Sequence, residues 1–394
     1  MISNGRNDEK LQTLSYTVYG EDEQYGYISD FFFNALFLHD KGNSQMKFVG
    51  HFMDNALFGE GIIQRIFVQK DKIVFFPLFG KNIYFFSKAD EKLNCIENIF
   101  CKDGEMYSGA LAFENGYLLV PKDLKTEILF LSDENELRPI PILSNNIKKA
   151  LADYDEAYTD VYGMCELDDR IYISVQNCNV MLEVGKSDYS VSLIDSHNTY
   201  SLGNVEILDD IIWITLLQDT ANNASVLSFD LKTYAFKEYY LPDAESGHTC
   251  YCFARYRDSL LALEYEGDHI WIFDKDMDEW IVFAYKTSYP SEFRRIRDGY
   301  PCFFGYYHAD GKLLLLPTGG NGIISINEET DELSFFPSRI PIDFMKKRIL
   351  IERQRRAKLV EDSIRCSSNE SIQETTEMDI GDYVECIVNT IGKN

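Results

Sequence analysis

The sequence of 394 residues predicts an all-β protein built from repeats, on the evidence of a recurring strand–loop–strand pattern, its period and the residue composition. About seven copies of the pattern occur. In each copy, the strand that follows the loop usually ends on an acidic or small residue. Equivalent positions in the copies are Tyr27, Ile73, Tyr117, Ile171, Ile212, Leu260 and Leu313. The steps between them are roughly 41 to 54 residues, the period typical of propeller blades. We therefore predict a seven-bladed β-propeller, with six blades as the alternative if the N-terminal strand completes the last blade.

Length and composition agree with one large all-β body. A chain of 394 residues exceeds the usual limit for one hydrophobic core, but a ring of blades avoids that limit because each blade buries its faces against its neighbours. Aromatic residues make up 14% of the chain, an excess that suits half-buried pleated surfaces. We therefore predict a single propeller domain over residues 1–340.

Each copy contains four predicted strands. In the third copy they are 107–113, 117–121, 127–132 and 137–143, separated by the segments ENG, KDLKT and DENE. Four antiparallel strands are the unit of a propeller blade. The apolar runs are about four to six residues long and are punctuated by Gly, Asn and Asp, which argues against helices.

Two hairpins carry a resemblance to known repeat proteins. The segments DRIYISV…NVMLEV and GKLLLLP…GIISIN are similar to hairpins of WD-repeat, Kelch-type and NHL-type propellers, and more closely to propeller-repeat proteins of anaerobic Gram-positive bacteria. The resemblance covers roughly Leu14–Ile340. The chain has neither a repeated Trp-Asp ending nor a Gly-Gly doublet in each copy, and it has no Asp box. What the resemblance implies is therefore a fold, and no activity.

Net charge limits the choice of partners. The chain has 64 acidic and 38 basic residues, a net charge of −26, so its surface should repel phosphate backbones and anionic membranes. We expect neither nucleic acid nor membrane as a partner. The polar N-terminal segment and nine cysteines without CxxC pairs lead us to expect the cytoplasm and no disulfides.

Loop lengths predict one plain face and one loop-rich face. Turns between first and second strands, and between third and fourth strands, are short and acidic. Second-to-third loops and links between blades are longer in several copies, as at 53–61, 144–160, 241–249 and 286–301. Because binding residues usually sit on variable loops of a rigid scaffold, we place the site on the loop-rich face and in the axial pocket.

Small residues recur where the innermost strands should converge on the axis. Eight positions before the repeat anchors lie Gly109, Gly163, Asn204, Cys252 and Gly305. Close approach of neighbouring strands would require such residues. The matching position of the second copy is Arg65, which breaks the pattern.

The axial positions also supply the candidate ligand-binding residues. Arg65 and Glu206 are the two charged residues predicted to point toward the axis. With Asn204 and Tyr307 they would form a polar floor, on which the arginine could bind a carboxylate or phosphate in bidentate fashion. The structural alternative is that Arg65 fills and neutralises the channel.

Catalytic and metal signatures are weak. His248, Cys250 and Cys252 alternate along one predicted strand and would share a face, but zinc ligands commonly come as close pairs from separate loops, and we interpret the thiols as core residues. Neither G-x-S-x-G nor a P-loop occurs. We predict no catalytic set, no metal and no cofactor. Glu264 and Glu266, on the loop-rich face, are the best acid–base candidates, and Glu264 joins the candidate ligand-binding residues.

The pattern changes after the last copy. Residues 341–365 predict a basic helical arm, 366–377 a polar linker and 378–394 an amphipathic terminal helix. We expect the terminal helix to dock on the chain itself or on a partner.

Two functions fit this sequence. The first is a non-catalytic binding or scaffolding propeller that presents its loop-rich face and axial pocket to a protein, a peptide or a small polar or carbohydrate ligand. The alternative is a glycan-acting hydrolase or lyase that uses the axial pocket, with Arg65 holding an acidic sugar and Glu206 or Glu264 transferring protons.

Overall fold

The computed structural model describes residues 13–340, apart from 32–33, 44, 53–62, 79, 102–106, 155–158, 177, 198–200, 218–224, 243–249, 266–268, 284–289 and 297–300. All of the described residues belong to the unit Met1–Ile342. The basic arm, polar linker and terminal helix predicted after residue 340 lie outside the described residues.

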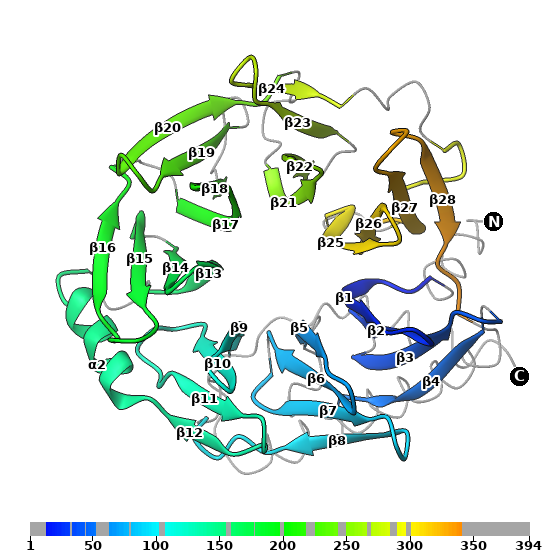
Figure 1. Cartoon of the computed structure of the whole chain (residues 1–394), viewed down its shortest axis with the longest axis horizontal. Coiled ribbons are helices and arrows are strands. Elements are labelled where there is room, and N and C mark those ends of the chain that lie inside the picture. Colours follow the sequence, from blue (N-terminus) through cyan, green and yellow to red (C-terminus); the bar gives the residue numbers. More distant parts are fainter. Residues whose placement is uncertain are drawn as a thin grey trace, which may run out of the picture. The chain divides into compact units, whose positions relative to one another are not determined.

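Seven four-stranded antiparallel sheets stand as blades around a central axis (Figure 1). Within each sheet the strands follow in chain order from the axis outward, so every blade is one uninterrupted segment. The predicted seven-bladed β-propeller is confirmed. The six-bladed alternative is wrong, because the segment LSYTVY supplies the inner strand of blade 1 rather than a strand of the last blade.

The first four blades have the following strands. Blade 1 has β1 (Tyr16–Glu21), β2 (Tyr25–Asp30), β3 (Ala35–Asp40) and β4 (Met46–His51). Blade 2 has β5 (Ile63–Val68), β6 (Lys72–Pro77), β7 (Ile83–Ser87) and β8 (Lys92–Ile96). Blade 3 has β9 (Tyr107–Phe113), β10 (Gly116–Pro121), β11 (Leu129–Ser132) and β12 (Leu137–Pro139). Blade 4 has β13 (Val161–Leu167), β14 (Arg170–Val175), β15 (Val180–Gly185) and β16 (Val191–Asp195).

The remaining three blades repeat the arrangement. Blade 5 has β17 (Ser201–Leu208), β18 (Ile211–Leu217), β19 (Ser225–Asp230) and β20 (Ala235–Tyr240). Blade 6 has β21 (Cys250–Tyr256), β22 (Ser259–Glu264), β23 (Ile270–Asp274) and β24 (Glu279–Val282). Blade 7 has β25 (Phe303–Ala309), β26 (Lys312–Pro317), β27 (Gly322–Asn327) and β28 (Leu333–Pro337). All seven repeat anchors lie in second strands.

The acidic or polar residue that closes the repeat has a structural role. Asp40, Asp230, Asp274 and Asn327 each accept hydrogen bonds from the backbone N–H groups two and three residues ahead. A side chain that satisfies these donors stabilises the tight turn between third and fourth strands. This explains why several repeats end on a carboxylate or amide.

Six apolar clusters join successive blades from blade 1 to blade 7. The cluster between blades 5 and 6, for example, packs Trp213 against Phe273 and Trp280, with ring centroids 4.5 and 5.3 Å apart. The near-continuous apolar runs of the sequence follow from this packing, because both faces of a blade are covered.

Hydroxyl groups are buried at the seam where blade 7 meets blade 1. Ser15 and Thr318 have no exposed surface, and Ser338 is 6% exposed. The Leu14 N–H donates to the Ser338 carbonyl at 3.2 Å, and the preceding residue, Thr13, pairs with Arg339 in an isolated bridge. The ring therefore closes without exchanging a strand between its first and last blades.

One predicted strand is largely replaced by a helix. The outer strand expected over 137–143 ends at Pro139, and helix α2 (Pro141–Ala150) follows. Pro141 suits the first helical turn, and Leu143 and Ile147, four residues apart, are buried in the cluster between blades 3 and 4. Within the described ranges, no helix has the length and hydropathy that crossing a membrane requires.

Every inner strand contains a β-bulge near its first residue. One extra residue interrupts the pairing of each inner strand with its second strand. The extra residues are Thr17, Gln64, Ser108, Tyr162, Tyr251 and Phe304, and in blade 5 the pair Gly203–Asn204 faces Thr215. A bulge bends the strand and re-aims its side chains, so it decides which residues reach the channel.

Candidate functional site: the central channel and its loop-rich mouth

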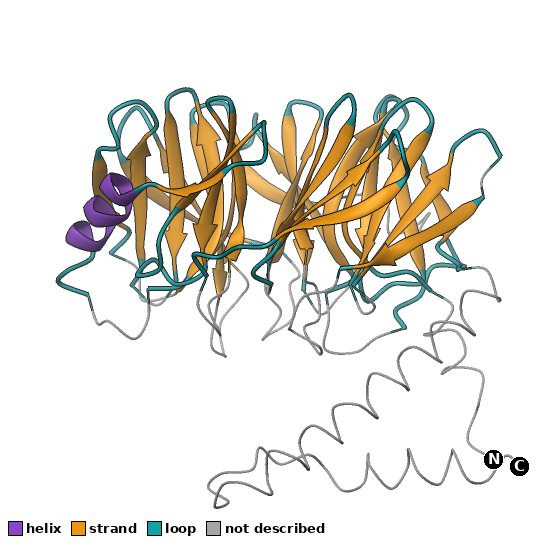
Figure 2. Ribbon diagram, turned by 90° about the horizontal axis from the view of Figure 1, so that it is seen from below, coloured by secondary structure: helices purple, strands orange, loops and turns teal. Residues whose placement is uncertain are grey.

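The two faces of the propeller differ as the sequence predicts. Short turns gather on one face, and the described parts of the second-to-third loops and of the links between blades lie at the other (Figure 2). Inner strands begin at this second face, because their first residues pair with the last residues of second strands, as Ile63 does with Pro77. The bulges therefore lie at the loop-rich mouth of the channel.

Each side of an inner strand faces a neighbouring blade. In blade 4, Met164 packs in the cluster shared with blade 3, and Cys165 packs in the cluster shared with blade 5. Only long or polar side chains can therefore leave these interfaces and reach the axis, from either side of the strand.

Arg65 is exposed on inner strand β5. Its backbone pairs with Phe76 just after the bulge at Gln64. Within the part of the chain that the structure describes, the guanidinium makes no hydrogen bond and no ion pair. A guanidinium of this kind can bind an anion without first losing a protein partner.

Glu206 is the centre of a hydrogen-bonded group that spans three blades. Its carboxylate accepts a 3.0 Å bond from Arg255 Nε of blade 6 and a 2.9 Å bond from the Tyr306 hydroxyl of blade 7. Burial raises the pKa of Tyr306, and the neighbouring Glu206 carboxylate raises it further. Tyr306 therefore stays a neutral donor at physiological pH.

The Cys165 thiol experiences the charges of both arginines. Burial raises the pKa of Cys165 and Glu206 raises it further, while Arg65 and Arg255 act in the opposite direction. The Cys165 side chain on blade 4 is therefore within electrostatic range of guanidinium groups on blades 2 and 6. The thiol stays protonated, so it is a poor nucleophile.

The other predicted floor residues bind the protein itself. The side-chain amide of Asn204 donates to the Tyr251 carbonyl at 2.7 Å. Tyr307 packs edge-on against Tyr19 of blade 1, with ring centroids 4.9 Å apart. The four predicted residues Arg65, Asn204, Glu206 and Tyr307 thus all lie on inner strands, but no direct contact joins any two of them among the described residues.

Aromatic side chains gather at the loop-rich mouth. Phe31 and Phe304 have ring centroids 5.8 Å apart, Phe304 and Tyr251 are 5.7 Å apart, and Tyr251 and Tyr265 are 5.4 Å apart. Tyr162 of blade 4 is close enough for Tyr265 to influence its hydroxyl, although burial is the main reason that the pKa of Tyr162 rises to about 12. We name these five residues the aromatic mouth.

Glu264 lies beside the aromatic mouth, at the end of β22. Its side chain is fully buried and accepts bonds from the His269 backbone N–H at 2.9 Å and from His269 Nδ1 at 2.8 Å. The imidazole stacks on Trp271 at 5.6 Å and is 14% exposed. A buried carboxylate bonded to Nδ1 fixes the orientation of the imidazole.

The predicted shared face of Cys250 and Cys252 is wrong, because the bulge at Tyr251 puts the two thiols on opposite sides of the blade. His248 lies outside the described residues. Burial raises the pKa of Cys252 to about 12, which disfavours the thiolate that metals bind. Among the described residues, no three His, Cys, Asp or Glu side chains are placed to hold a metal ion.

Sequence reasoning missed Arg255, Tyr306 and the aromatic bulge residues. Only one side of each inner strand was assigned to the axis, whereas Arg255 and Tyr306 lie on the other side. The available signal was the sequence spacing: Tyr162, Tyr251 and Phe304 each stand one residue before the small residue of the repeat, Gly163, Cys252 or Gly305.

Known structures share this fold at low sequence identity. Virginiamycin B lyase from Staphylococcus aureus is 9% identical, with a TM-score of 0.57 over 79% of this chain and 94% of that chain. Its catalytically inactive histidine-to-alanine variant, solved with quinupristin, is 16% identical, with a TM-score of 0.51 over 70% and 84%. YCF48 bound to D1 peptide is 8% identical, with a TM-score of 0.55 over 78% and 90%.

The chain is a β-propeller. At these identities the likeness shows the fold alone. No protein-family model matches the sequence, and no curated protein does.

Proposed function

We propose that this β-propeller is a non-catalytic binding protein whose channel, entered from the loop-rich face, takes a carboxylate or phosphate group of a small ligand or peptide. The observation that carries the proposal is the exposed guanidinium of Arg65, which has no partner among the described residues. An arginine can bind such anions through two parallel hydrogen bonds.

The surroundings of Arg65 favour an anion over a cation. Arg255 is a second guanidinium in the channel, and Glu206 offsets its charge through a 3.0 Å ion pair. Among the described residues, no carboxylate forms an ion pair with Arg65, so its charge is not offset in this way. The channel also has room beside blade 7, because a Cβ added to Gly305 would meet no atom within 4 Å.

The aromatic mouth suits a ligand with a flat or ring-shaped part. Tyrosine and phenylalanine rings bury large apolar surfaces at low entropic cost, and the tyrosine hydroxyls add hydrogen bonds. Binding of a peptide by a propeller has a precedent among the similar structures, in YCF48 with the D1 peptide. A protein, peptide or carbohydrate partner that bears an acid group would satisfy both the mouth and Arg65.

The proposal can be tested by calorimetric titration of the full chain with inorganic phosphate and with glucuronate. We expect saturable binding that Arg65→Gln weakens by about tenfold or more, since a charge-assisted bidentate contact is lost. Arg138→Gln is the matched control, because Arg138 is an exposed arginine on the outer strand β12. Equal affinity of the wild type and Arg65→Gln, or no binding of either anion, would show that the proposal is wrong.

A catalytic alternative is favoured by one observation, the contact between buried Glu264 and His269. An imidazole fixed by a carboxylate is a common general base. In a glycan lyase it would remove the proton from the carbon next to the sugar carboxylate. The electron pair of that C–H bond would form a C=C double bond, and the glycosidic oxygen would leave with the electron pair of the C–O bond. The similar S. aureus lyase has a catalytically inactive histidine-to-alanine variant. Turnover of acidic oligosaccharides that His269→Gln abolishes and Arg65→Gln impairs would favour this alternative.

A further inference from the structure

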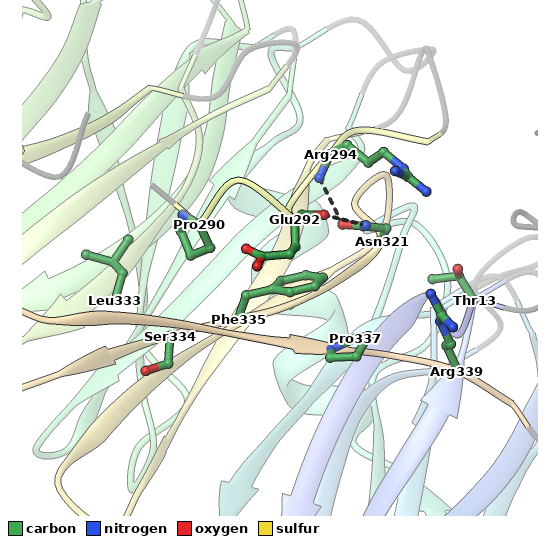
Figure 3. Close-up of a pocket in the computed structure, with 10 residues that line it drawn as sticks. All are labelled: Thr13, Pro290, Glu292, Arg294, Asn321, Leu333, Ser334, Phe335, Pro337 and Arg339. Atoms are coloured by element: carbon green, nitrogen blue, oxygen red, sulfur yellow. Dashed lines mark hydrogen bonds between the residues drawn. The ribbon is translucent and has the colours of Figure 1, made fainter. Parts of the chain in front are cut away.

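A cavity of about 740 Å³ lies on the outer side of blade 7, apart from the central channel (Figure 3). Its walls come from outermost strand β28, the segment 290–294 that precedes blade 7, the loop between β26 and β27, and Thr13. Two arginines, Arg294 and Arg339, line it together with the ring of Phe335.

Hydrogen bonds hold the inner wall of the cavity in place. Asn321 accepts a 2.9 Å bond from the Arg294 N–H and donates a 2.9 Å bond to the Glu292 carbonyl. The Asn321 N–H also donates to the Arg294 carbonyl at 3.1 Å. Asn321 thus anchors the backbone of this segment at Glu292 and Arg294.

Apolar surface forms the floor. Phe335 is half-buried and packs edge-on against Phe293, with ring centroids 6.2 Å apart. Pro290 and Pro337 add rigid apolar walls. A floor of this kind favours a flat apolar group that can pack on the Phe335 ring.

The charged groups are divided between the two ends of the cavity. In Figure 3 the Arg339 side chain lies beside Thr13 at one end, and the Glu292 carboxylate lies on the other side of the Phe335 ring. Arg339 is exposed, and its side chain makes no hydrogen bond or ion pair within the described ranges. The two arginines outnumber the one carboxylate here, in a chain whose net charge is −26.

We propose that this cavity is a second ligand site, which binds an aromatic carboxylate with its ring on Phe335 and its carboxylate on Arg339. A cation does not suit the site, since Glu292 is held away from Arg339 and the two arginines give the lining a net positive charge. The site is independent of the anion site proposed at Arg65, because Arg65 lies on the innermost strand of blade 2 and Arg339 lies beyond the outermost strand of blade 7.

The test measures binding of two probes of similar shape to the full chain, 2-naphthoate and the uncharged 2-naphthalenemethanol. Binding is measured by ligand-observed NMR titration. We expect saturable binding of naphthoate and at least tenfold weaker binding of the alcohol. Arg339→Gln should weaken naphthoate binding by about tenfold, and Phe335→Leu by about three- to tenfold.

Two control variants distinguish this site from the central channel and from exposed arginines in general. Arg138→Gln removes another exposed outer-strand arginine, one that lies 4.8 Å from the Phe130 ring, and should leave naphthoate affinity unchanged. Arg65→Gln should also leave it unchanged, and a loss there would mean that the probe occupies the channel, which overturns the proposal. No saturable binding by the wild type, equal binding of the alcohol, or full affinity in Arg339→Gln would overturn it as well. Because Arg339 is exposed, its variant tests the site even if Phe335→Leu does not fold.

Discussion

The Ser15 hydroxyl donates a 3.0 Å hydrogen bond to the backbone carbonyl of Thr318, 303 residues away in the sequence. A second hydrogen bond runs in the opposite direction: the Thr318 hydroxyl donates a 3.1 Å bond to the carbonyl of Tyr16, the residue after Ser15. Both bonds are buried, and they join blade 7 to blade 1. The closure of the ring thus depends on reciprocal bonds between side-chain hydroxyls and backbone carbonyls.

The seam should be sensitive to the loss of a single hydroxyl. Thr318→Val keeps the shape of the side chain but leaves the buried Tyr16 carbonyl without this donor, so we expect a loss of about 1–3 kcal/mol in the free energy of unfolding. Urea denaturation measures the change. Thr126→Val is the control, since the Thr126 hydroxyl makes no hydrogen bond among the described residues and the change should cost less than about 0.5 kcal/mol. Equal stability of the two variants would contradict the assigned role of the seam.

The glycines of the inner strands should differ in their tolerance of a methyl group. A Cβ at Gly163 would lie 2.8 Å from the Val205 nitrogen and 2.9 Å from the Asn204 Cα, both backbone atoms of blade 5. Gly163→Ala should therefore destabilise the protein by about 1–3 kcal/mol through overpacking. Gly305→Ala is the matched control, because its added Cβ would meet nothing within 4 Å. Thermal unfolding of both variants gives the comparison, and a stable Gly163→Ala variant would contradict the close approach of blades 4 and 5.

The ion pair between Glu206 and Arg255 should be measurable as a coupling energy. We expect about 0.5–1.5 kcal/mol from a double-mutant cycle of Glu206→Gln and Arg255→Gln, because Glu206 is 20% exposed whereas Arg255 is 48% exposed and partly screened by water. Denaturation of the wild type, both single variants and the double variant yields this energy. A coupling energy of zero would mean that the two groups are separately solvated.

Acid stability should depend on Asp22, which connects blade 1 to Lys88 of blade 2 at 2.8 Å. Burial alone would raise the pKa of Asp22, but hydrogen bonds from Lys88, the Tyr25 N–H and the Tyr27 hydroxyl outweigh it and hold that pKa well below 3.8. The stabilisation is thus fully present above pH 3.8 and is lost as the pH falls through the folded-state pKa.

Asp22→Asn should therefore lower stability near neutral pH and flatten its decline on acidification from about pH 5 to 2. Chemical denaturation at a series of pH values measures both effects. Asp258→Asn, at an exposed turn residue without hydrogen bonds or ion pairs among the described residues, serves as the control. An unchanged pH profile in Asp22→Asn would contradict the role of Asp22.

The ring and its blades could be predicted from the sequence because strand burial determines which residues occur at the repeat anchors. Each anchor, such as Ile171 or Leu260, lies near the start of a second strand whose apolar run is buried on both faces. The carboxylate that ends a third strand caps the following turn, as Asp230 does. Strand pairing and turn chemistry thus leave a periodic record in the sequence.

The β-bulges could not be predicted in this way, because no periodic sequence pattern marks them. One extra residue at Tyr251 reverses the side-chain alternation, which is why Cys250 and Cys252 were placed on the same face. Helix α2 is not predicted by the sequence, since its two buried apolar residues, Leu143 and Ile147, lie in a segment whose pattern is that of an edge strand followed by a loop.

The channel residues were predictable only in part. Arg65 and Glu206 stand out in the sequence because they interrupt a column of small or apolar residues, and both lie on inner strands. Arg255 was not found, because simple alternation assigns a single side of each inner strand to the axis, while the structure has polar side chains leaving both sides.

Because each blade is one contiguous segment of the chain, the order and number of blades can be changed without cutting a sheet. No sheet is shared between the first and last blades, so the boundary between them separates two whole sheets, as every other blade boundary does. A circular permutant that starts at any later blade would keep all seven sheets whole. Duplication or loss of one segment of roughly 41 to 54 residues would likewise add or remove a complete sheet.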